Sequence, residues 1–452
     1  MENFAKRRGR LPSRRALCLG VVAGIGCASL ASAAEDGSLT WNGITLYGVF
    51  DLGVAYQTHG TPLSQNWMVG LEYFIQKNSN KSITSVAPNG LSQSRLGVQG
   101  SETIVEGLSF LFNLDMGFCP QSGNLADALK SLTHNNGVPL ANQTSAGDSS
   151  LAGQFFNRSA YAGLSWRDYG TLTFGRQNTL LLDNILAYDP MRGSYAFSVI
   201  GLSGTTAGMG ATEDARLDGS FKYLWKGDLF RFGALYQPGK TDGSPGEAWQ
   251  LTGGFGYAGF SVDGVYGHKK DAIQAASLNA AQAAMEPLGS LAATISDNTS
   301  YTLDGSYAWE NLRAFLGYEH IQYRNPSLPI TEPFSGLGGY YLSVLNNGAY
   351  PHPRILQVSW GGLRYAFSAQ TEITGAFYHY DQNSYGATRC SDTSAGSCSG
   401  TLWAYSLMLD YHFTRRLDVY TGVMYSKVAD GMASGYLNTS TADPMVGFRF
   451  QF

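Results

Sequence analysis

The sequence predicts an all-β fold, a single closed barrel of sixteen antiparallel strands that spans a membrane, with short turns at one end and long loops at the other. Three observations lead to this prediction. Apolar residues alternate with polar or small residues from Ile44 to the C-terminus, which is the period of a strand with two different faces. After the first 33 residues no segment is apolar for 18 residues, so membrane-spanning helices are excluded. Short and long connectors follow each other in turn.

Residues 1–33 have the features of a secretory signal peptide, and residues 34–452 form the single expected domain. A basic start is followed by the apolar stretch Ala16–Leu30 and the small-residue cleavage motif Ala31-Ser32-Ala33. A transmembrane anchor is the weaker interpretation, because about 20 apolar residues are needed to cross a bilayer. Two minor alternatives are a twin-arginine address at Arg14-Arg15 and a lipid-modified Cys27.

The expected mature chain is acidic. The whole chain has 30 Lys and Arg residues and 34 Asp and Glu residues; the leader contains six of the first group and one of the second, which leaves 24 against 33, or a charge of about −9. An acidic exported chain is a poor candidate for nucleic-acid binding. Nothing indicates a cofactor or a metal, and the seven histidines have no metal-ligand spacing.

The individual strands are expected where the alternation is cleanest. Trp403, Tyr405 and Leu407 alternate with Ala404 and Ser406, for example. By this criterion strands begin near Ile44, Ser94, Leu108, Arg158, Thr171, Gly219, Leu229, Trp249, Phe260, Thr299, Leu312, Gln357, Gln370, Leu402, Leu417 and Asp443. The pattern breaks at Gly361-Gly362, where we expect a β-bulge.

Aromatic residues cluster at the expected strand ends, as in the interfacial girdle of a membrane barrel. A soluble β-sandwich or propeller also alternates, but its apolar face turns inward and its aromatic residues are placed differently. We therefore expect apolar side chains to face lipid and polar ones to face the lumen.

The connectors support the same topology. Tight turns are expected at Gly227-Asp228, Ala258-Gly259, Glu310-Asn311, Ser368-Ala369 and Thr414–Arg416, and long loops at Gln57–Gln93, Phe118–Asn157, His268–Asn298, Arg324–Leu356, Gln382–Thr401 and Val428–Ala442. The alanine-rich segment Ala272–Ala293 predicts a short helix within one of these loops.

One further loop, between Gly175 and Leu217, has some forty residues without sustained alternation. Loops of that length in a compact domain are uncommon and are usually functional. We predict that residues 177–217 fold into the barrel and narrow it.

Two cysteines, Cys390 and Cys398, bracket a short polar loop and are expected to form a disulfide in an oxidising compartment. Cys119 is left over, and the sequence allows it to be free or to compete for one of the other two.

Several motifs resemble one known family. They are Ile44–Asp51 (ITLYGVFD), Ser94–Glu102 (SRLGVQGSE), Phe156–Leu164 (FNRSAYAGL), Tyr169–Gln177 (YGTLTFGRQ) and the terminal Phe452. Together they resemble the Gram-negative general porins of the β-proteobacterial type. The resemblance implies a homotrimer in the outer membrane, in contact with lipids and lipopolysaccharide, with short periplasmic turns, long extracellular loops and an in-folded third loop. It also implies that Phe452 is the signal for the barrel-assembly machinery.

The same resemblance assigns candidate residues at the constriction. The basic wall positions are Arg95, Arg158 and Arg176, and the acidic loop positions are Asp183, Asp189, Glu213 and Asp214. Asp183 and Asp189 have a second interpretation, in which they cap or pin the loop backbone. This chain departs from the family pattern at Gln99, at Thr103-Ile104 and in the glycine-rich stretch Gly201–Gly210.

A water-filled channel for ions and small hydrophilic solutes needs a polar wall, a defined width and an electric field, but no acid, base or nucleophile. The polar half of the alternation supplies the wall; the main candidates are Asp115, Lys222, Arg231 and Arg449, and the others are Lys226, Asp263, Asp304, Arg313, Glu319, Glu372, Asp410 and Asp418. The runner-up function is a substrate-specific channel for a sugar, an amino acid or an organic anion. A barrel enzyme and an adhesin are the remote alternatives.

Overall fold

The computed structural model describes residues 39–67, 81–148, 150–200, 215–239, 246–388, 390 and 395–452. The expected signal peptide and the expected loop residues Glu213 and Asp214 lie outside these ranges. No helix in the described part of the chain is both long and apolar enough to cross a membrane.

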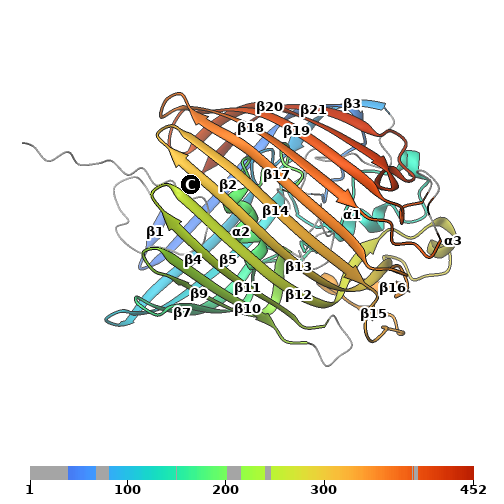
Figure 1. Ribbon diagram of the computed structural model, residues 1–452, viewed down its shortest axis with the longest axis horizontal. Helices are drawn as coiled ribbons and strands as arrows, with labels where there is room; N and C mark the ends of the chain where they lie inside the picture. The colour runs from blue at the N-terminus through green and yellow to red at the C-terminus, as the bar shows by residue number, and fades with distance from the viewer. Residues whose placement is uncertain are drawn as a thin grey trace, which may run out of the picture.

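Sixteen strands form the wall, and each pairs antiparallel with the next (Figure 1). They are β2 (Ile44–Gly60), β4 (Arg95–Val105), β5 (Leu108–Cys119), β7 (Ser159–Trp166), β8 (Gly170–Asn178), β9 (Arg216–Lys226), β10 (Phe230–Gln237), β11 (Ala248–Tyr257), β12 (Phe260–Ala276), β13 (Leu291–Trp309), β14 (Leu312–Arg324), β17 (Arg354–Ala366), β18 (Thr371–Gln382), β19 (Gly400–His412), β20 (Leu417–Asp430) and β21 (Ser440–Gln451). The predicted fold class is confirmed.

The barrel closes between its first and last wall strands. Val49–Ala55 of β2 pairs with Met445–Gln451 of β21. The C-terminal residue extends this ladder, because the Phe452 N–H donates to the Gly48 carbonyl at 3.1 Å and the Gly48 N–H donates to the Phe452 carbonyl at 2.9 Å. Closure leaves no unpaired edge in the wall, which is the condition for strands to cross a membrane.

Smaller elements lie outside the wall, several of them at the long-loop end (Figure 1). They are β1 (Leu39–Trp41), β3 (Lys81–Pro88), β6 (Asn124–Leu125), β15 (Phe334–Ser335), β16 (Tyr341–Asn346), the helices α1 (Ala128–His134), α2 (Leu180–Tyr188) and α3 (Ala280–Ala283), and the short 3-10 turns Leu140–Asn142, Leu337–Gly339 and Gly431–Ala433. Helix α2 differs from the other two because it lies inside the barrel, against β10 to β14.

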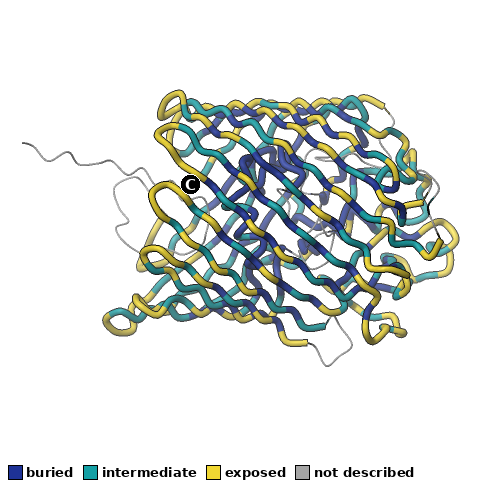
Figure 2. Tube along the Cα trace, in the orientation of Figure 1, coloured by how far each residue is buried: buried dark blue, intermediate teal, exposed yellow. Residues whose placement is uncertain are grey.

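The side chains alternate as expected on the outer face. On β19, Trp403, Tyr405 and Leu407 are exposed, whereas Ala404 and Ser406 are buried. Figure 2 shows the same alternation of more buried and more exposed residues along most wall strands. The outward apolar residues are those that the sequence assigned to lipid.

Fifteen of the sixteen strands begin within three residues of the predicted positions, but β13 begins at Leu291 instead of near Thr299. The short helix expected in the alanine-rich segment Ala272–Ala293 is confirmed, and it is confined to Ala280–Ala283. Ala272, Ala275 and Ala293 are buried in β12 and β13 instead. Packing against loop residues such as Leu129 and Leu342 overrides the helix propensity of alanine in this long hairpin.

The bulge expected at Gly361-Gly362 is absent, since β17 pairs with both neighbours without a register shift. The glycines instead make room inside and outside the wall. A Cβ atom at Gly362 would lie 2.6 Å from Cγ of Pro190, and one at Gly361 would lie 2.9 Å from the Phe377 ring. The break in the pattern therefore marks the place where the in-folded loop touches the wall.

The inner face is less polar than the sequence predicted. One arc, formed by β14 and β17 to β20, turns Val358, Trp360, Tyr378, Tyr380 and Leu402 inward, and all five are buried. The expectation of a uniformly polar inner wall is wrong on this arc, because the residues of the in-folded loop cover it.

Candidate functional site in the barrel interior

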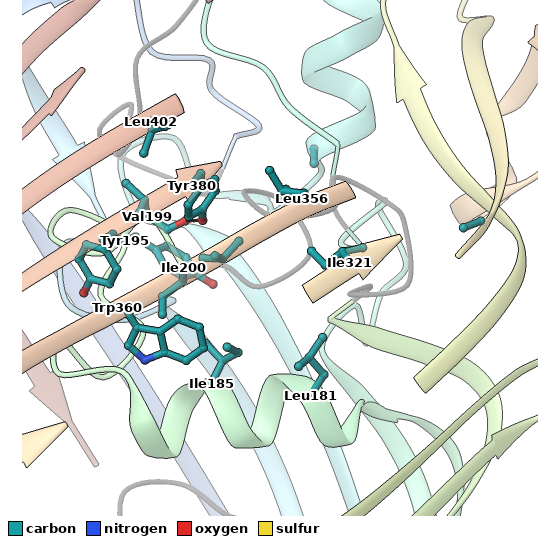
Figure 3. Close-up of a cluster of buried hydrophobic side chains, with 14 of the residues drawn as sticks. Leu181, Ile185, Tyr195, Val199, Ile200, Ile321, Leu356, Trp360, Tyr380 and Leu402 are labelled. Carbon is teal, nitrogen blue, oxygen red and sulfur yellow. Dashed lines mark hydrogen bonds between the residues drawn. The ribbon is translucent and has the colours of Figure 1, made fainter. Parts of the chain in front are cut away.

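The interior site begins with the loop between β8 and β9. Thr179 caps helix α2, since its hydroxyl oxygen accepts a hydrogen bond from the Leu182 N–H at 3.1 Å. The helix then presents Leu181 and Ile185 to the inner wall, where Trp360 lies close by (Figure 3). The predicted folding of this loop into the barrel is what the described residues 179–200 show.

After α2 the chain follows the apolar arc. The Trp360 indole N–H donates to the Tyr188 carbonyl at 3.2 Å, and the Tyr380 hydroxyl donates to the Val199 carbonyl at 3.0 Å. Tyr195, Val199 and Ile200 pack beside these rings (Figure 3). Wall residues thus satisfy loop carbonyls that would otherwise be buried without a partner.

Asp189 fixes the turn after α2. Its carboxylate accepts hydrogen bonds from the Met191 N–H at 3.1 Å, the Gly193 N–H at 2.8 Å and the Tyr378 hydroxyl at 2.7 Å. Asp189 is fully buried. Of the two roles that the sequence left open, these contacts fit the pinning role.

Asp183 also holds the loop. Its carboxylate forms an ion pair with Lys222 of β9 and accepts a hydrogen bond from the Asn178 amide at 3.1 Å. The Lys222 ammonium group also donates to the Asn178 carbonyl at 3.0 Å. These contacts fasten the start of α2 to the wall and neutralise both predicted site charges.

Arg231 of β10 contacts the C-terminal end of α2 through Tyr188. Its guanidinium group forms a two-point contact with the Asp263 carboxylate, at 2.6 and 2.7 Å. The Tyr188 hydroxyl donates to the same carboxylate at 2.6 Å and lies 2.8 Å from Nη2 of Arg231. Planar two-point pairs of this kind are rigid as well as strong.

The predicted basic wall has two different parts. Arg95 of β4 has no ion pair among the described residues, and Arg158 is paired with Asp115 of β5 at 3.0 Å. Arg95 and Arg158 interact with each other and with Tyr195 of the loop. Both therefore belong to the side of the interior that faces the loop.

Arg176 has a structural role. Its guanidinium group contacts Asp218 at 2.6 Å and donates to the carbonyls of Asn157, at 2.6 and 3.0 Å, and Ser150, at 2.5 Å. Only 8% of its side chain is exposed. These contacts hold the segment before β7 to the wall.

The remaining predicted residues lie apart from this group. Arg449 of β21 pairs with Asp418 of β20, whose other carboxylate oxygen contacts Nδ1 of His412 at 2.6 Å. Cys390 and Cys398 form a disulfide with a Cα–Cα distance of 5.5 Å, and Cys119 is buried and has no disulfide partner among the described residues. Phe452 is partly exposed on the outer face.

Three arginines that the sequence did not single out join the interior. Arg216 begins β9 beside Asn178 and interacts with Arg158 and Arg176. Arg192 lies in the loop, and Arg364 lies on β17. The sequence could have indicated Arg192, because Asp189-Pro190-Met191-Arg192-Gly193 has the Asp, Pro and Gly residues of a turn, and Arg192 is the fourth residue of that turn.

Comparison with known proteins identifies the chain. The family model for Gram-negative porins matches residues 19–431. This chain belongs to the Gram-negative porin family. An outer membrane porin protein of Bordetella pertussis is 23% identical over 402 residues, which cover 85% of this chain and 89% of that protein.

Solved structures agree on the fold. The anion-selective porin from Comamonas acidovorans superposes with a TM-score of 0.60 at 16% identity, covering 90% of this chain and 99% of that one. The trimer form of OmpT from Vibrio cholerae gives a TM-score of 0.54 at 14% identity, covering 90% of this chain and 99% of that one. The porin is thus an outer-membrane channel for small solutes, and its family points to a channel rather than an enzyme.

Proposed function

We propose that this porin conducts ions and small hydrophilic solutes by passive diffusion, and that its narrow interior favours anions. The observation that carries the proposal is the excess of arginine where the loop approaches the wall. Arg95, Arg158 and Arg216 lie there with Asp115 as the one carboxylate in contact with any of them among the described residues.

The local charge is expected to matter more than the net charge of the chain. Charges far from the passage are screened over about 8 Å at physiological salt. In a narrow space bordered by protein the effective dielectric constant is lower than in water, so nearby charges act more strongly. The arginine-rich side of the interior that faces the loop therefore favours anions even though the chain as a whole is acidic.

The test is the reversal potential of the purified mature porin in planar bilayers under a KCl gradient. Wild type should give stepwise conductance with an anion preference, and Arg95→Gln combined with Arg216→Gln should shift the reversal potential toward cations. Lys270→Gln is the matched control, because Lys270 pairs with Glu247 away from the interior and is 45% exposed. Unchanged selectivity in the double variant would contradict the anion preference, and silent membranes would contradict the channel.

Neutralising Arg95, Arg158 and Arg176 together is the broader form of the test suggested by the sequence. Arg176 is better left in place, because its contacts with Asp218 and with the Asn157 carbonyl hold the fold. Liposome swelling with sugars, amino acids and organic anions separates a general pore from a substrate-specific channel, since a general pore should admit these solutes in order of size.

We further propose that the chain is exported with cleavage after Ala33, is inserted by the barrel-assembly machinery, and forms a homotrimer among lipids and lipopolysaccharide. The partly exposed ring of Phe452 and its main-chain pairing with Gly48 are compatible with a C-terminal assembly signal. Removal of Phe452 should lower the amount of folded porin in the outer membrane, and cross-linking of the wild type should trap three chains.

A further inference from the structure

A second group of arginines lies at the short-turn end of the barrel, apart from Arg95 and its neighbours. Arg313 is the second residue of β14, directly after the turn Glu310-Asn311. Arg364 is its register partner on β17. Arg192 reaches the same place from the in-folded loop and pairs with Glu372 of β18 at 2.9 Å.

The two strand arginines share one ring. The guanidinium carbon of Arg313 lies 5.3 Å from the centroid of the Phe315 ring, and that of Arg364 lies 4.8 Å from it. Two like charges directly opposite each other in a sheet are unfavourable. Cation–π contacts with a shared ring offset part of this repulsion but do not remove it.

Direct ion pairs in the described part of the chain reach two of the three arginines. Glu372 is shared, because Arg364 Nε lies 3.5 Å from the same oxygen that contacts Arg192. Asp189 is the other carboxylate that interacts with Arg364, and its oxygens already accept two backbone N–H groups and the Tyr378 hydroxyl. Asp410, the register partner of Glu372 on β19, also interacts with Arg192. Arg313 is the member of the cluster that has no ion pair among the described residues.

Further donors are unused. Nε of Arg313 and the hydroxyl of Thr374, the register partner of Arg364 on β18, have no hydrogen-bond partner in the described part of the chain. Arg192 is 30% exposed on its side chain and Arg313 is partly exposed, so a solute in the channel can reach them. The Arg364 side chain is 8% exposed and donates a hydrogen bond to the Pro190 carbonyl, so it lies behind the other two and adds its charge to the site. The backbone of Arg192 has a φ of 57°, which few residues other than glycine adopt. Its position is therefore imposed by the turn that Asp189 organises.

We propose that Arg192, Arg313 and Arg364 form a binding site for a small oxyanion at the short-turn end of the channel. Planar guanidinium groups match the oxygen pairs of phosphate and carboxylate groups, which a monatomic anion does not offer. Glu372 competes with the ligand for Arg192 and Arg364 and so keeps its binding weak, as conduction requires. This site rests on the channel function proposed above and adds a ligand class to it.

The test uses the full mature porin in planar bilayers with KCl on both sides and inorganic phosphate as the probe. In wild type, phosphate should reduce the chloride current in a saturable manner. Arg313→Gln combined with Arg364→Gln should raise the half-blocking phosphate concentration at least tenfold, whereas Glu372→Gln should lower it severalfold. Lys270→Gln should leave it unchanged.

These outcomes separate the site from the channel. A conducting wild-type pore that phosphate does not block, or a double variant that phosphate blocks like wild type, would overturn the site and leave the channel function standing. Thermal unfolding in detergent gives an independent measurement. Arg313→Gln should raise the unfolding temperature because it relieves the repulsion with Arg364; a fall would indicate that Arg313 only supports the fold, and would count against the site.

Discussion

The hydrogen bond between Tyr378 and Asp189 allows the sharpest test of how the loop is held. Both residues are buried, and the hydroxyl-to-carboxylate distance is 2.7 Å. A hydrogen bond to a charged group contributes about 1.5–3 kcal/mol. Tyr378→Phe removes this one hydrogen bond and leaves the two backbone N–H groups that donate to Asp189. We therefore expect the free energy of unfolding to fall by about 2 kcal/mol. Because 1.4 kcal/mol corresponds to a factor of ten in an equilibrium constant, the equilibrium constant for release of the loop from the wall should rise about 30-fold.

Two measurements check this magnitude. Denaturant unfolding of the detergent-solubilised porin should show a lower free energy, and hydrogen exchange of residues 189–200 should accelerate while exchange in the wall strands stays unchanged. Asp189→Ala should cost more than Tyr378→Phe, since it leaves the Met191 and Gly193 N–H groups and the tyrosine hydroxyl without their acceptor.

The matched control is Tyr405→Phe on β19, because that side chain is 51% exposed on the outer face. It removes the same hydroxyl from a residue that does not touch the loop. If the two tyrosine variants differ by less than about 0.5 kcal/mol, which is the usual scatter for surface changes, the loop is not held by Asp189 as described.

Three other predictions follow from particular contacts. Gly362→Val should displace the loop from the wall and alter the single-channel conductance, because a Cβ atom at this position would lie 2.6 Å from Pro190. Gly375→Ala is the control, since the nearest atom to its Cβ would be 3.9 Å away and the conductance should not change. Equal effects of the two variants would refute the close approach of the loop to Gly362. Replacing Cys390 and Cys398 with serine should lower the free energy of unfolding by at most about 2–3 kcal/mol and leave the single-channel conductance unchanged. A changed conductance in planar bilayers would contradict this prediction. Asp127, the N-cap of α1, accepts a hydrogen bond from the Tyr340 hydroxyl at 2.6 Å, and burial raises the pKa of this carboxyl group. The protonated Asp127 carboxyl group therefore stabilises the folded loop fully below the ordinary aspartate pKa, and this stabilisation is lost as pH rises through the higher pKa of the folded state. The resistance of this loop to proteases should fall with rising pH in wild type but not in Asp127→Asn.

The sequence by itself determined the wall. A strand shows its two faces to different surroundings, so the two-residue period can be read locally, as at Trp403–Leu407, and glycine and short polar turns mark where each strand ends. The same local logic found the in-folded loop from its length and the disulfide from the spacing of Cys390 and Cys398. It found the short helix at Ala280–Ala283 but missed that β12 and β13 extend into the alanine-rich segment on either side, because small residues fit a packed hairpin as well as a helix.

Only the tertiary structure decided what the charges do. Asp189 is 189 residues from Tyr378, and Arg313 meets Arg364 through strand register, so no local pattern pairs them. The predicted acidic loop positions Asp183 and Asp189 contact Lys222 and Tyr378, which hold the loop, and Arg192, with 30% of its side chain exposed against 14% for Asp183, is the more exposed charge of the described loop. An ionic group can pair with any partner that the fold brings near it, and its role therefore depends on contacts between distant parts of the chain.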